Sequence, residues 1–305
     1  MRSPLGPLSP GDRVTVLATA GPAPTDRVDR AIALLESWGL VVDVAESVRS
    51  GHQRARYLSA DDAIRARDLT EAWCDPEVDG IFCIRGGYGT VRMLDLLDVD
   101  RMRSAAPKPV YGSSDVTGLH EWMREQLGAA GWFTPMIGTT DLLDDAVAVD
   151  QLRAAVFSPA SSWTSAAAET LVPGTAEGTL LGGNLTLLAM TLGARTRPPL
   201  DNRGSIALIE DVTEEVYRID SLLHPLLRSG WFDGVTGVAL GSWKDCDPLP
   251  EIRALAEEFF APLGIPVVWE LGFGHGPAAH SIPLGVPGRL IADDHPRLEL
   301  ITPLA

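Results

Sequence analysis

Short apolar, β-branched runs alternate with helix-periodic segments in the first part of the chain. Residues 13–20 (RVTVLATA) form one such run, and the turn residues at 21–24 (GPAP) end it. The next segment has apolar residues at helical spacing, with Thr25 as a candidate cap and Gly39 at its end. A second apolar run follows at 40–44. Since parallel strands need a crossover helix between them, this β-α-β unit predicts an α/β fold with a parallel sheet.

The pattern recurs before residue 130. Residues 80–84 and 109–111 read as buried strands, and each is followed by a glycine-containing turn and a helix-periodic segment. A further helix is predicted ahead of the first of these strands, where Ser59 and Asp62 have the spacing of a capping box. No internal repeat of fixed period accompanies the alternation, so a solenoid is not expected.

The middle of the chain has a different composition. Residues 158–178 are rich in Ala, Ser, Thr, Pro and Gly, which predicts a linker or a long loop between two domains. Strand signals resume at 205–209, 235–240 and 265–269. A length of 305 residues is also more than one small core needs, and it agrees with two domains or one large α/β unit.

Charge and cysteine content exclude several classes of protein. The formal net charge is −16, and no run of Lys or Arg offers the basic surface that nucleic-acid binding requires. The three cysteines, Cys74, Cys83 and Cys246, form no C-x-x-C pair and no disulfide framework, so a reducing compartment is expected. The first residues lack the apolar core of a signal peptide, and no stretch has the length of a membrane span. We therefore expect a cytoplasmic protein without membrane or nucleic-acid partners.

Three turns contain residues suited to catalysis, and ligands of open α/β sheets bind beyond the carboxyl ends of the strands. In residues 112–115 (GSSD), Ser114 lies between a predicted strand and a predicted helix, which can hold its hydroxyl on a sharp turn. Residues 85–89 (RGGYG) let the backbone approach a ligand closely, and they match no dinucleotide or phosphate-loop motif. The alternative interpretations are a Ser/Asp helix cap at the first turn and a simple strand-to-helix connection at the second.

His275 is flanked by glycines in residues 272–277 (GFGHGP), which places it on a loop. Histidine is the usual general base near neutral pH, with His280 as the nearest rival here. The sequence lacks metal-ligand spacing such as H-E-x-x-H, so no metal is expected. Such a base needs an orienting acid, and Glu210 follows a buried apolar run where an unpaired carboxylate would be costly. The alternative is that Glu210 is an exposed loop acid.

In combination, these segments resemble the LD-carboxypeptidase family, which includes the microcin-C immunity peptidases. The matching motifs occur in a shared order over most of the chain, at residues 11–24, 57–62 (YLSADD), 84–90 (IRGGYGT), 111–117 (YGSSDVT), 182–185 (GGNL), 208–220 (LIEDVTEEVYRID), 245–247 (DCD), 274–275 (GH) and 282–285 (IPLG). The resemblance implies that Ser114 is the nucleophile, Glu210 the triad acid and His275 the triad base. It also implies an oxyanion hole made by the backbone N–H groups of Gly87 and Asp115.

The resemblance further implies the architecture and the assembly. An N-terminal Rossmann-like, parallel-sheet domain (1–157) would carry the serine, and a β-rich C-terminal domain (179–305) beyond the linker at 158–178 would carry the acid and the base. The active site would then lie between the domains. Family members are often homodimers, and the same is expected here.

The activity implied by the resemblance is serine carboxypeptidase chemistry. The enzyme would release the terminal D-Ala of a murein tetrapeptide during cell-wall recycling, through an acyl-enzyme and without a metal or cofactor. Arg85, or backbone near Gly86 and Tyr88, could bind the free carboxylate. Residues 133–136 read FTPM where the family commonly has HGPM, which leaves the specificity open.

The sequence also allows two rival functions. One is an immunity-type hydrolase of aminoacyl- or peptidyl-nucleotide toxins, which would need an aromatic platform such as Trp163 or Trp243. The other is a non-catalytic ligand-binding protein on the same fold, because a fold does not fix a function.

Overall fold

The computed structural model describes residues 5–194 and 201–304. Its N-terminal region is built on a six-stranded sheet with the order β12-β5-β4-β3-β1-β2. The strands are β1 (Arg13–Leu17), β2 (Val41–Val44), β3 (Gly80–Cys83), β4 (Val110–Gly112), β5 (Trp132–Phe133) and β12 (Ile282–Pro283). The first five pair in parallel, as the alternation predicts, and β12 returns from the C-terminal part to pair antiparallel with β5.

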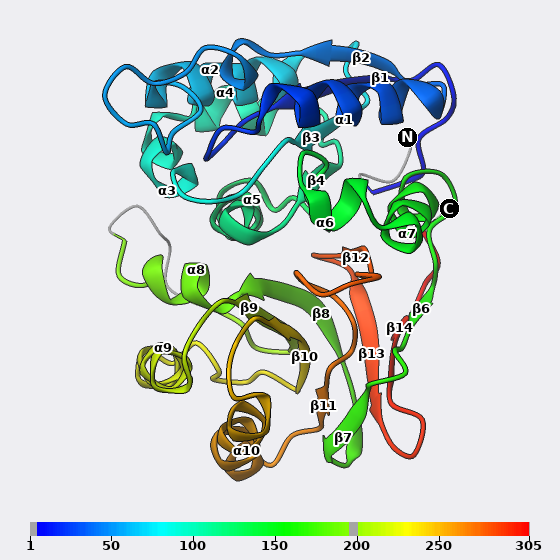
Figure 1. Cartoon of the computed structure of the whole chain (residues 1–305). Coiled ribbons are helices and arrows are strands. Elements are labelled where there is room, and N and C mark those ends of the chain that lie inside the picture. The colour runs from blue at the N-terminus through cyan, green and yellow to red at the C-terminus, as the bar shows by residue number, and fades with distance from the viewer. Residues whose placement is uncertain (1–4, 195–200, 305) are drawn as a thin grey trace.

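Helices cover both faces of this first sheet (Figure 1). Alternate residues of the strands contribute to two buried clusters. One contains Val16 and Phe82 and packs against α1 (Thr25–Ser37) and α7 (Ala146–Phe157). The other contains Leu17 and Ile81 and packs against α2 (Asp62–Cys74) and α5 (Thr117–Leu127). The helical segments are α1 (Thr25–Ser37), η1 (Glu46–Val48), α2 (Asp62–Cys74), α3 (Thr90–Met93), η2 (Leu94–Leu96), α4 (Val99–Ser104), η3 (Ser114–Val116), α5 (Thr117–Leu127), α6 (Thr140–Leu143) and α7 (Ala146–Phe157).

The C-terminal part contains an eight-stranded sheet with the order β6-β14-β13-β8-β9-β10-β11-β7. Its strands are β6 (Ser162–Trp163), β7 (Glu169–Val172), β8 (Gly174–Asn184), β9 (Ser205–Val212), β10 (Gly237–Lys244), β11 (Val267–Trp269), β13 (Pro287–Ala292) and β14 (Arg297–Leu300). The four central strands β8 to β11 are parallel, and the outer pairs are antiparallel.

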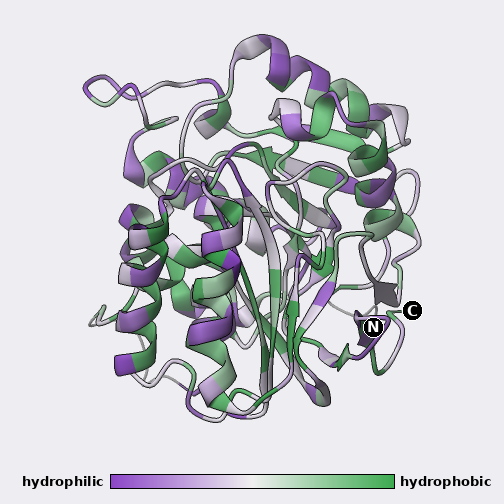
Figure 2. Ribbon diagram, turned by 60° about the horizontal axis from the view of Figure 1, so that its bottom comes forward, coloured by the Kyte–Doolittle hydropathy of each residue, from purple (hydrophilic) through white to green (hydrophobic). Residues whose placement is uncertain are grey.

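Helices α8 (Leu185–Met190), α9 (Val216–Arg228) and α10 (Leu249–Phe260) pack on one face of the second sheet, and η4 (Ala261–Leu263) follows α10. Figure 2 shows the outer faces of the helices in the hydrophilic colour and much of the strand layer in the hydrophobic colour. The opposite face of this sheet forms a cluster that includes Phe133 of β5 and Ile282 of β12. The two halves of the chain therefore share buried apolar contacts.

The structure corrects three local expectations. The segment 158–178 is not a simple linker, because β6, β7 and the start of β8 lie within it and pair into the second sheet. Its Ala, Ser, Thr and Gly residues hide the strand pattern, since small polar side chains give little hydrophobic alternation. Thr25 is the first residue of α1 after an N-cap at Pro24, and Ser59 caps no helix. In the described ranges, no helix has both the length and the apolar character needed to cross a bilayer.

Candidate active site

Ser114 lies on a sharp turn between the end of β4 and the start of η3. Its φ of 56° is left-handed, an uncommon conformation for a residue with a side chain. Such backbone strain costs on the order of 1–3 kcal/mol and persists only where the surroundings fix it. The backbone N–H of Ser113 donates to the Met136 sulfur at 3.0 Å, which helps to hold the turn. Because no side-chain cap bond is formed at η3 or α5, the helix-cap alternative is wrong.

The glycine-rich turn after β3 packs directly against this serine. A Cβ placed on Gly86 would lie 2.7 Å from Ser114 Cβ and 2.8 Å from Ser114 Oγ, so only glycine fits without a shift. The buried carboxylate of Asp115 joins the two turns, because its Oδ2 accepts the Thr90 backbone N–H at 2.7 Å. Burial raises the pKa of Asp115, and the hydrogen bonds from Thr90 act against that rise. Gly87, which follows Gly86 in the glycine-rich turn, has a φ of 102°.

Glu210 and His275 form a hydrogen-bonded pair in the C-terminal part. Glu210 lies within β9 and has no exposed surface, and its Oε2 is 2.7 Å from His275 Nδ1. The exposed-acid alternative for Glu210 is therefore wrong. A Cβ on Gly274 would come within 2.6 Å of the same Oε2, so a glycine is needed beside the histidine. Ser242 Oγ accepts the Gly276 backbone N–H at 2.8 Å and fastens the other side of the loop.

The electrostatics of this pair raise the pKa of His275. Burial on its own lowers the pKa of His275, but the Glu210 carboxylate and its hydrogen bond outweigh burial and leave that pKa above the ordinary value. Asp211 follows Glu210 in the chain and is also buried. Burial, with a contribution from the charge of Glu210, raises the pKa of Asp211 to about 6. The charges of two adjacent buried carboxylates, Glu210 and Asp211, thus both raise the pKa of His275.

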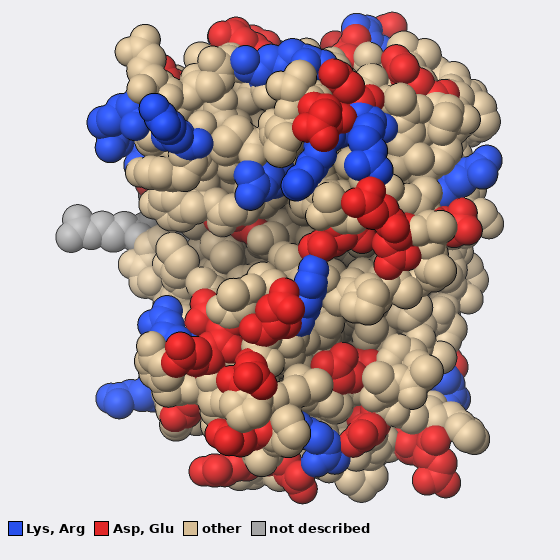
Figure 3. All heavy atoms as spheres, in the orientation of Figure 1, with Lys and Arg blue, Asp and Glu red and all other residues tan. Residues whose placement is uncertain are grey.

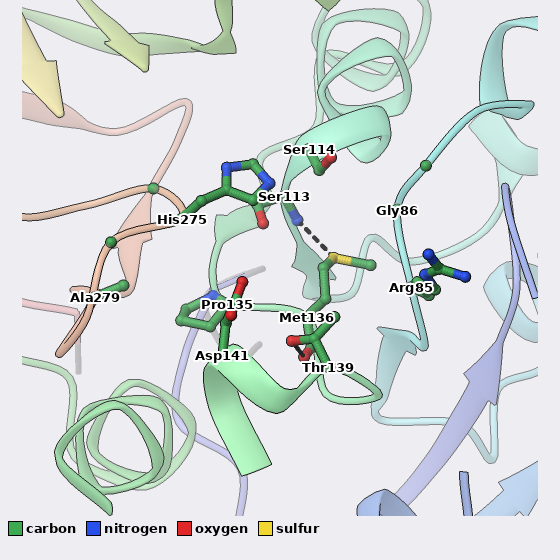
Figure 4. A pocket seen from close by; sticks show the side chains of 13 residues that line it. Arg85, Gly86, Ser113, Ser114, Pro135, Met136, Thr139, Asp141, His275 and Ala279 are labelled. Atoms are coloured by element: carbon green, nitrogen blue, oxygen red, sulfur yellow. Dashed lines mark hydrogen bonds between the residues drawn. The ribbon is translucent and has the colours of Figure 1, made fainter. Parts of the chain in front are cut away.

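A pocket of about 180 Å³ is lined by residues of both halves of the chain. It lies in the furrow between the N-terminal region and the C-terminal part that is visible in Figure 3. Both Ser114 and His275 line it, and Figure 4 shows the imidazole and the serine turn on the same side, with Arg85 on the other. Within the described residues no hydrogen bond joins Ser114 to His275. Catalytic hydrogen bonds are often long before substrate binds, so the absence of this bond does not separate the two side chains, which line the same pocket.

The proposed substrate-binding residues divide into two groups. Arg85 and Gly86 line the pocket, and the Arg85 guanidinium donates to the Pro22 carbonyl at 2.5 Å. Tyr88 is not among the pocket residues; it is partly exposed, and its ring lies 6.1 Å from that of Tyr57. Of the three candidates, two therefore border the space where a ligand would sit.

The rival residues considered from the sequence have other partners. Both ring nitrogens of His280 are engaged, one with the Gln151 side chain and the other with the Thr164 carbonyl at 2.7 Å. Trp163 and Trp243 are each only 4% exposed, so neither offers a free aromatic surface to a nucleobase. Within residues 5–194 and 201–304, no group of three or more His, Cys, Asp or Glu side chains is placed to hold a metal ion.

Several residues at the site were not singled out from the sequence. Asp141 lines the pocket, and its carboxylate pairs at 2.8 Å with Lys244 at the end of β10, which links the two halves. Asn184 donates a hydrogen bond to Glu210 at 3.2 Å. The only available signal for Asn184 was its place in the GGNL motif, and no sequence signal pairs Asp141 with Lys244, because 103 residues separate them.

Comparison with known proteins agrees with this arrangement. Residues 14–134 match the LD-carboxypeptidase N-terminal domain and residues 177–290 match the LD-carboxypeptidase C-terminal domain. A Streptomyces coelicolor protein provisionally named as a carboxypeptidase is 47% identical, covering 94% of this chain and 92% of its own. The murein tetrapeptide carboxypeptidase of Pseudomonas aeruginosa is 32% identical, covering 90% of this chain and 91% of its own.

Solved structures give the same result for the fold. The muramoyltetrapeptide carboxypeptidase from Oxalobacter formigenes superposes with a TM-score of 0.80 at 29% identity, covering 94% of this chain and 98% of its own. The microcin C7 self-immunity protein in its wild-type apo state superposes with a TM-score of 0.86 at 21% identity, covering 99% and 100%. The second likeness shows the shared fold alone. From the two matched domains and the identity to its relatives, the chain belongs to the LD-carboxypeptidase family of serine peptidases.

Proposed function

We propose that this peptidase hydrolyses an amide bond between an L-centre and a terminal D-amino acid, with Ser114, His275 and Glu210 as its catalytic triad. The observation that carries the proposal is the 2.7 Å contact between Glu210 and His275 at a pocket that Ser114 also lines. Since Glu210 occupies His275 Nδ1, the other ring nitrogen, Nε2, is left to serve the serine.

The reaction proceeds by acyl transfer. His275 Nε2 takes the hydroxyl proton as Ser114 Oγ bonds to the substrate carbonyl carbon, and Glu210 stabilises the resulting imidazolium. The backbone N–H groups of Gly87 and Asp115 donate to the oxyanion of the tetrahedral intermediate, and one such donor is worth about 3–4 kcal/mol in comparable enzymes. The imidazolium gives its proton to the leaving amine as the C–N bond breaks. Water then attacks the acyl-enzyme with His275 as base and restores the free serine.

The substrate we propose is a murein tetrapeptide from which D-Ala is released. Support comes from the relatives named as murein tetrapeptide and muramoyltetrapeptide carboxypeptidases. A pocket of about 180 Å³ also suits a small leaving residue. Arg85 is the cation we assign to the substrate's free carboxylate, because it lines the pocket across from His275.

Replacing the nucleophile tests this function directly. Wild-type enzyme should release D-Ala from a murein tetrapeptide, and Ser114→Ala should lose at least about 10³-fold in kcat, as loss of a triad nucleophile does. Ser113→Ala is the matched control, and it should keep most of the activity. Release at the wild-type rate by the Ser114 variant would refute the proposed nucleophile.

The same assay separates the rival functions. Hydrolysis of an aminoacyl sulfamoyl adenosine, with no release from the tetrapeptide, would favour the immunity-type activity. The solved microcin C7 self-immunity protein in complex with aspartyl sulfamoyl adenosine makes that compound class a suitable probe. Absence of hydrolysis with both substrates, together with saturable binding, would instead favour a binding protein.

We also propose a cytoplasmic homodimer with two domains, in which the first covers 1–157 and the second, predicted at 179–305, extends back over the strands within 158–178. Three free cysteines, two of them buried, suit a reducing compartment. Exposed apolar side chains such as Met190, Tyr217 and Leu249 offer surface for self-association. Sedimentation velocity at micromolar concentration tests the dimer, and a single species of 32.6 kDa would contradict it.

A further inference from the structure

Asn184 stands where the serine side and the acid side of the site meet. It is the last residue of β8, only 3% of its surface is exposed, and it pairs in register with Glu210 on the neighbouring strand β9. Its side-chain amide donates both to Glu210 Oε1 at 3.2 Å and to Asp211 Oδ1 at 2.8 Å. One neutral donor group thus serves two adjacent buried carboxylates.

This contact fixes the second oxygen of the proposed triad acid. Glu210 Oε2 faces His275 Nδ1 at 2.7 Å, and Oε1 faces the Asn184 amide. A carboxylate held at both oxygens cannot turn about its last bond without breaking a buried hydrogen bond, which costs about 1–3 kcal/mol. The angle of the imidazole therefore depends on Asn184 through Glu210.

Asn184 is itself held on two further sides. Its Oδ1 accepts the Leu187 backbone N–H at 3.2 Å as the N-cap of α8, so the amide orientation is determined by its partners. Its backbone N–H donates to Thr117 Oγ1 at 3.0 Å, in the helix that follows Ser114. The neighbouring Gly183 has a φ of 145°, and a Cβ there would lie 2.5 Å from the same Thr117 oxygen. The close approach of β8 to α5 is thus built around this position.

We propose that Asn184 is a positioning residue for the reaction: it locks Glu210 in the orientation that serves His275 and ties that carboxylate to the helix that follows Ser114. This inference rests on the triad proposed above. The role needs a donor with two hydrogens between two carboxylates, and an amide side chain supplies it without adding charge.

The variant Asn184→Ser tests the role while keeping the cap of α8. Serine is also a favoured N-cap, so α8 keeps its cap, but the shorter side chain cannot reach both carboxylates. We expect kcat for the tetrapeptide to fall about tenfold to a hundredfold with KM within about twofold, the scale of a lost orienting contact. The matched control is Asn202→Ser, since Asn202 is equally buried and donates instead to the Trp231 carbonyl.

The pH profile separates positioning from general destabilisation. Without their shared donor the two carboxylates repel each other more strongly and hold a proton more readily, which weakens their field on His275. The acidic limb of the kcat/KM profile should therefore move to lower pH by about half a unit to one unit. Asn202→Ser should lower the unfolding midpoint only and leave the limb in place.

The outcomes distinguish this inference from the proposed triad. A folded Asn184→Ser enzyme with wild-type kcat and an unmoved limb overturns the positioning role while the inactivity of Ser114→Ala still supports the triad. The role is also overturned if Asn184→Ser, like Asn202→Ser, lowers the unfolding midpoint but leaves the acidic limb in place. If Asn184→Ser shows no cooperative unfolding transition, Asn184→Thr is judged by the same criteria, because threonine is also an N-cap residue, fills more of the vacated space, adds no charge and has a single hydroxyl hydrogen for two carboxylates.

Discussion

The two halves of the cleft hold their reactive groups by different means. On the serine side, backbone conformation positions the nucleophile: Ser114 has a φ of 56°, and the missing side chain of Gly86 leaves room for the Ser114 hydroxyl. On the other side, hydrogen bonds between side chains orient Glu210 and His275. The difference indicates that the serine half should be sensitive to steric change and the histidine half to changes of charge and pH. Three variants test that contrast.

The largest effect is expected from Glu210→Gln. The neutral amide cannot stabilise an imidazolium, so kcat should fall by about 10³–10⁴-fold, as in other triads whose acid becomes an amide. The Glu210 carboxylate is what holds the pKa of His275 above its usual value against burial. Its loss lowers that pKa, and since the base must be neutral, the residual activity should set in at lower pH than in wild type. Stopped assays from pH 5 to 9 measure both changes.

Glu215→Gln is the control for this variant. It removes the same charge five residues later, from an exposed side chain at the start of α9. Both kcat and the acidic limb should stay close to wild type. A Glu210→Gln enzyme with an unshifted acidic limb would mean that the limb reports some other group than His275.

The serine half should respond to Gly86→Ala with a loss of about 10²-fold in kcat/KM. Gly86 is not among the glycines with positive φ, so its backbone accepts alanine, and the added Cβ meets Ser114 at 2.7 Å. A displacement of the nucleophile by a fraction of an ångström to 1 Å accounts for a loss of that size. No charge changes near His275, so the pH profile of the remaining activity should keep its wild-type limbs.

Gly118→Ala tests whether the loss comes from crowding at the serine. Gly118 lies in α5, just beyond the serine turn, and the nearest contact of an added Cβ would be a Val91 methyl at 3.3 Å, close but without the overlap found at Gly86. Activity should be retained in this control, because alanine also favours a helix. Equal losses in the two variants would refute the claim that the space at Gly86 serves the serine.

Sequence reasoning reached the local parts of this site and missed the contacts between them. The β-α-β alternation predicted the first sheet, and motifs located Ser114, Glu210 and His275 on the turns and the strand where the structure places them. The strands within 158–178 were hidden because β6 has two residues and β7 has four, too few to show a hydrophobic period among the small residues around them. The Asp141–Lys244 pair depends on how the halves meet, which local pattern does not encode.

Local sequence pattern also could not predict the role of Asp145. This residue departs from the contrast between the halves, because its side chain hydrogen-bonds to both of them. Its Oδ1 caps α7 on the serine side by accepting from Val147 and Ala148, while Oδ2 accepts the Ala278 backbone N–H at 2.7 Å, three residues beyond His275. A side chain of the N-terminal region therefore steadies the histidine loop. The Ala278 hydrogen bond, followed by those of the helix cap, holds the pKa of Asp145 below its usual value.

Asp145→Ala should have the smallest effect, about 1 kcal/mol in stability from the lost cap and roughly threefold to tenfold in kcat from a looser loop. Because the native pKa is depressed, the stabilisation by Asp145 is present above the ordinary aspartate pKa of about 3.9 and fades as the pH falls through the native value. The difference in unfolding free energy between wild type and variant should shrink over that acidic range.

Asp98→Ala is the matched cap variant. The Asp98 carboxylate caps α4 by accepting the backbone N–H of Arg101, and among the described residues it has no contact with the histidine loop. It should lose similar stability and no activity. If both variants lost the same stability and neither lost activity, the loop of His275 would be held from within its own half, by Ser242 and Gly274. The separation of the halves into a backbone-held serine and a hydrogen-bonded base would then be complete.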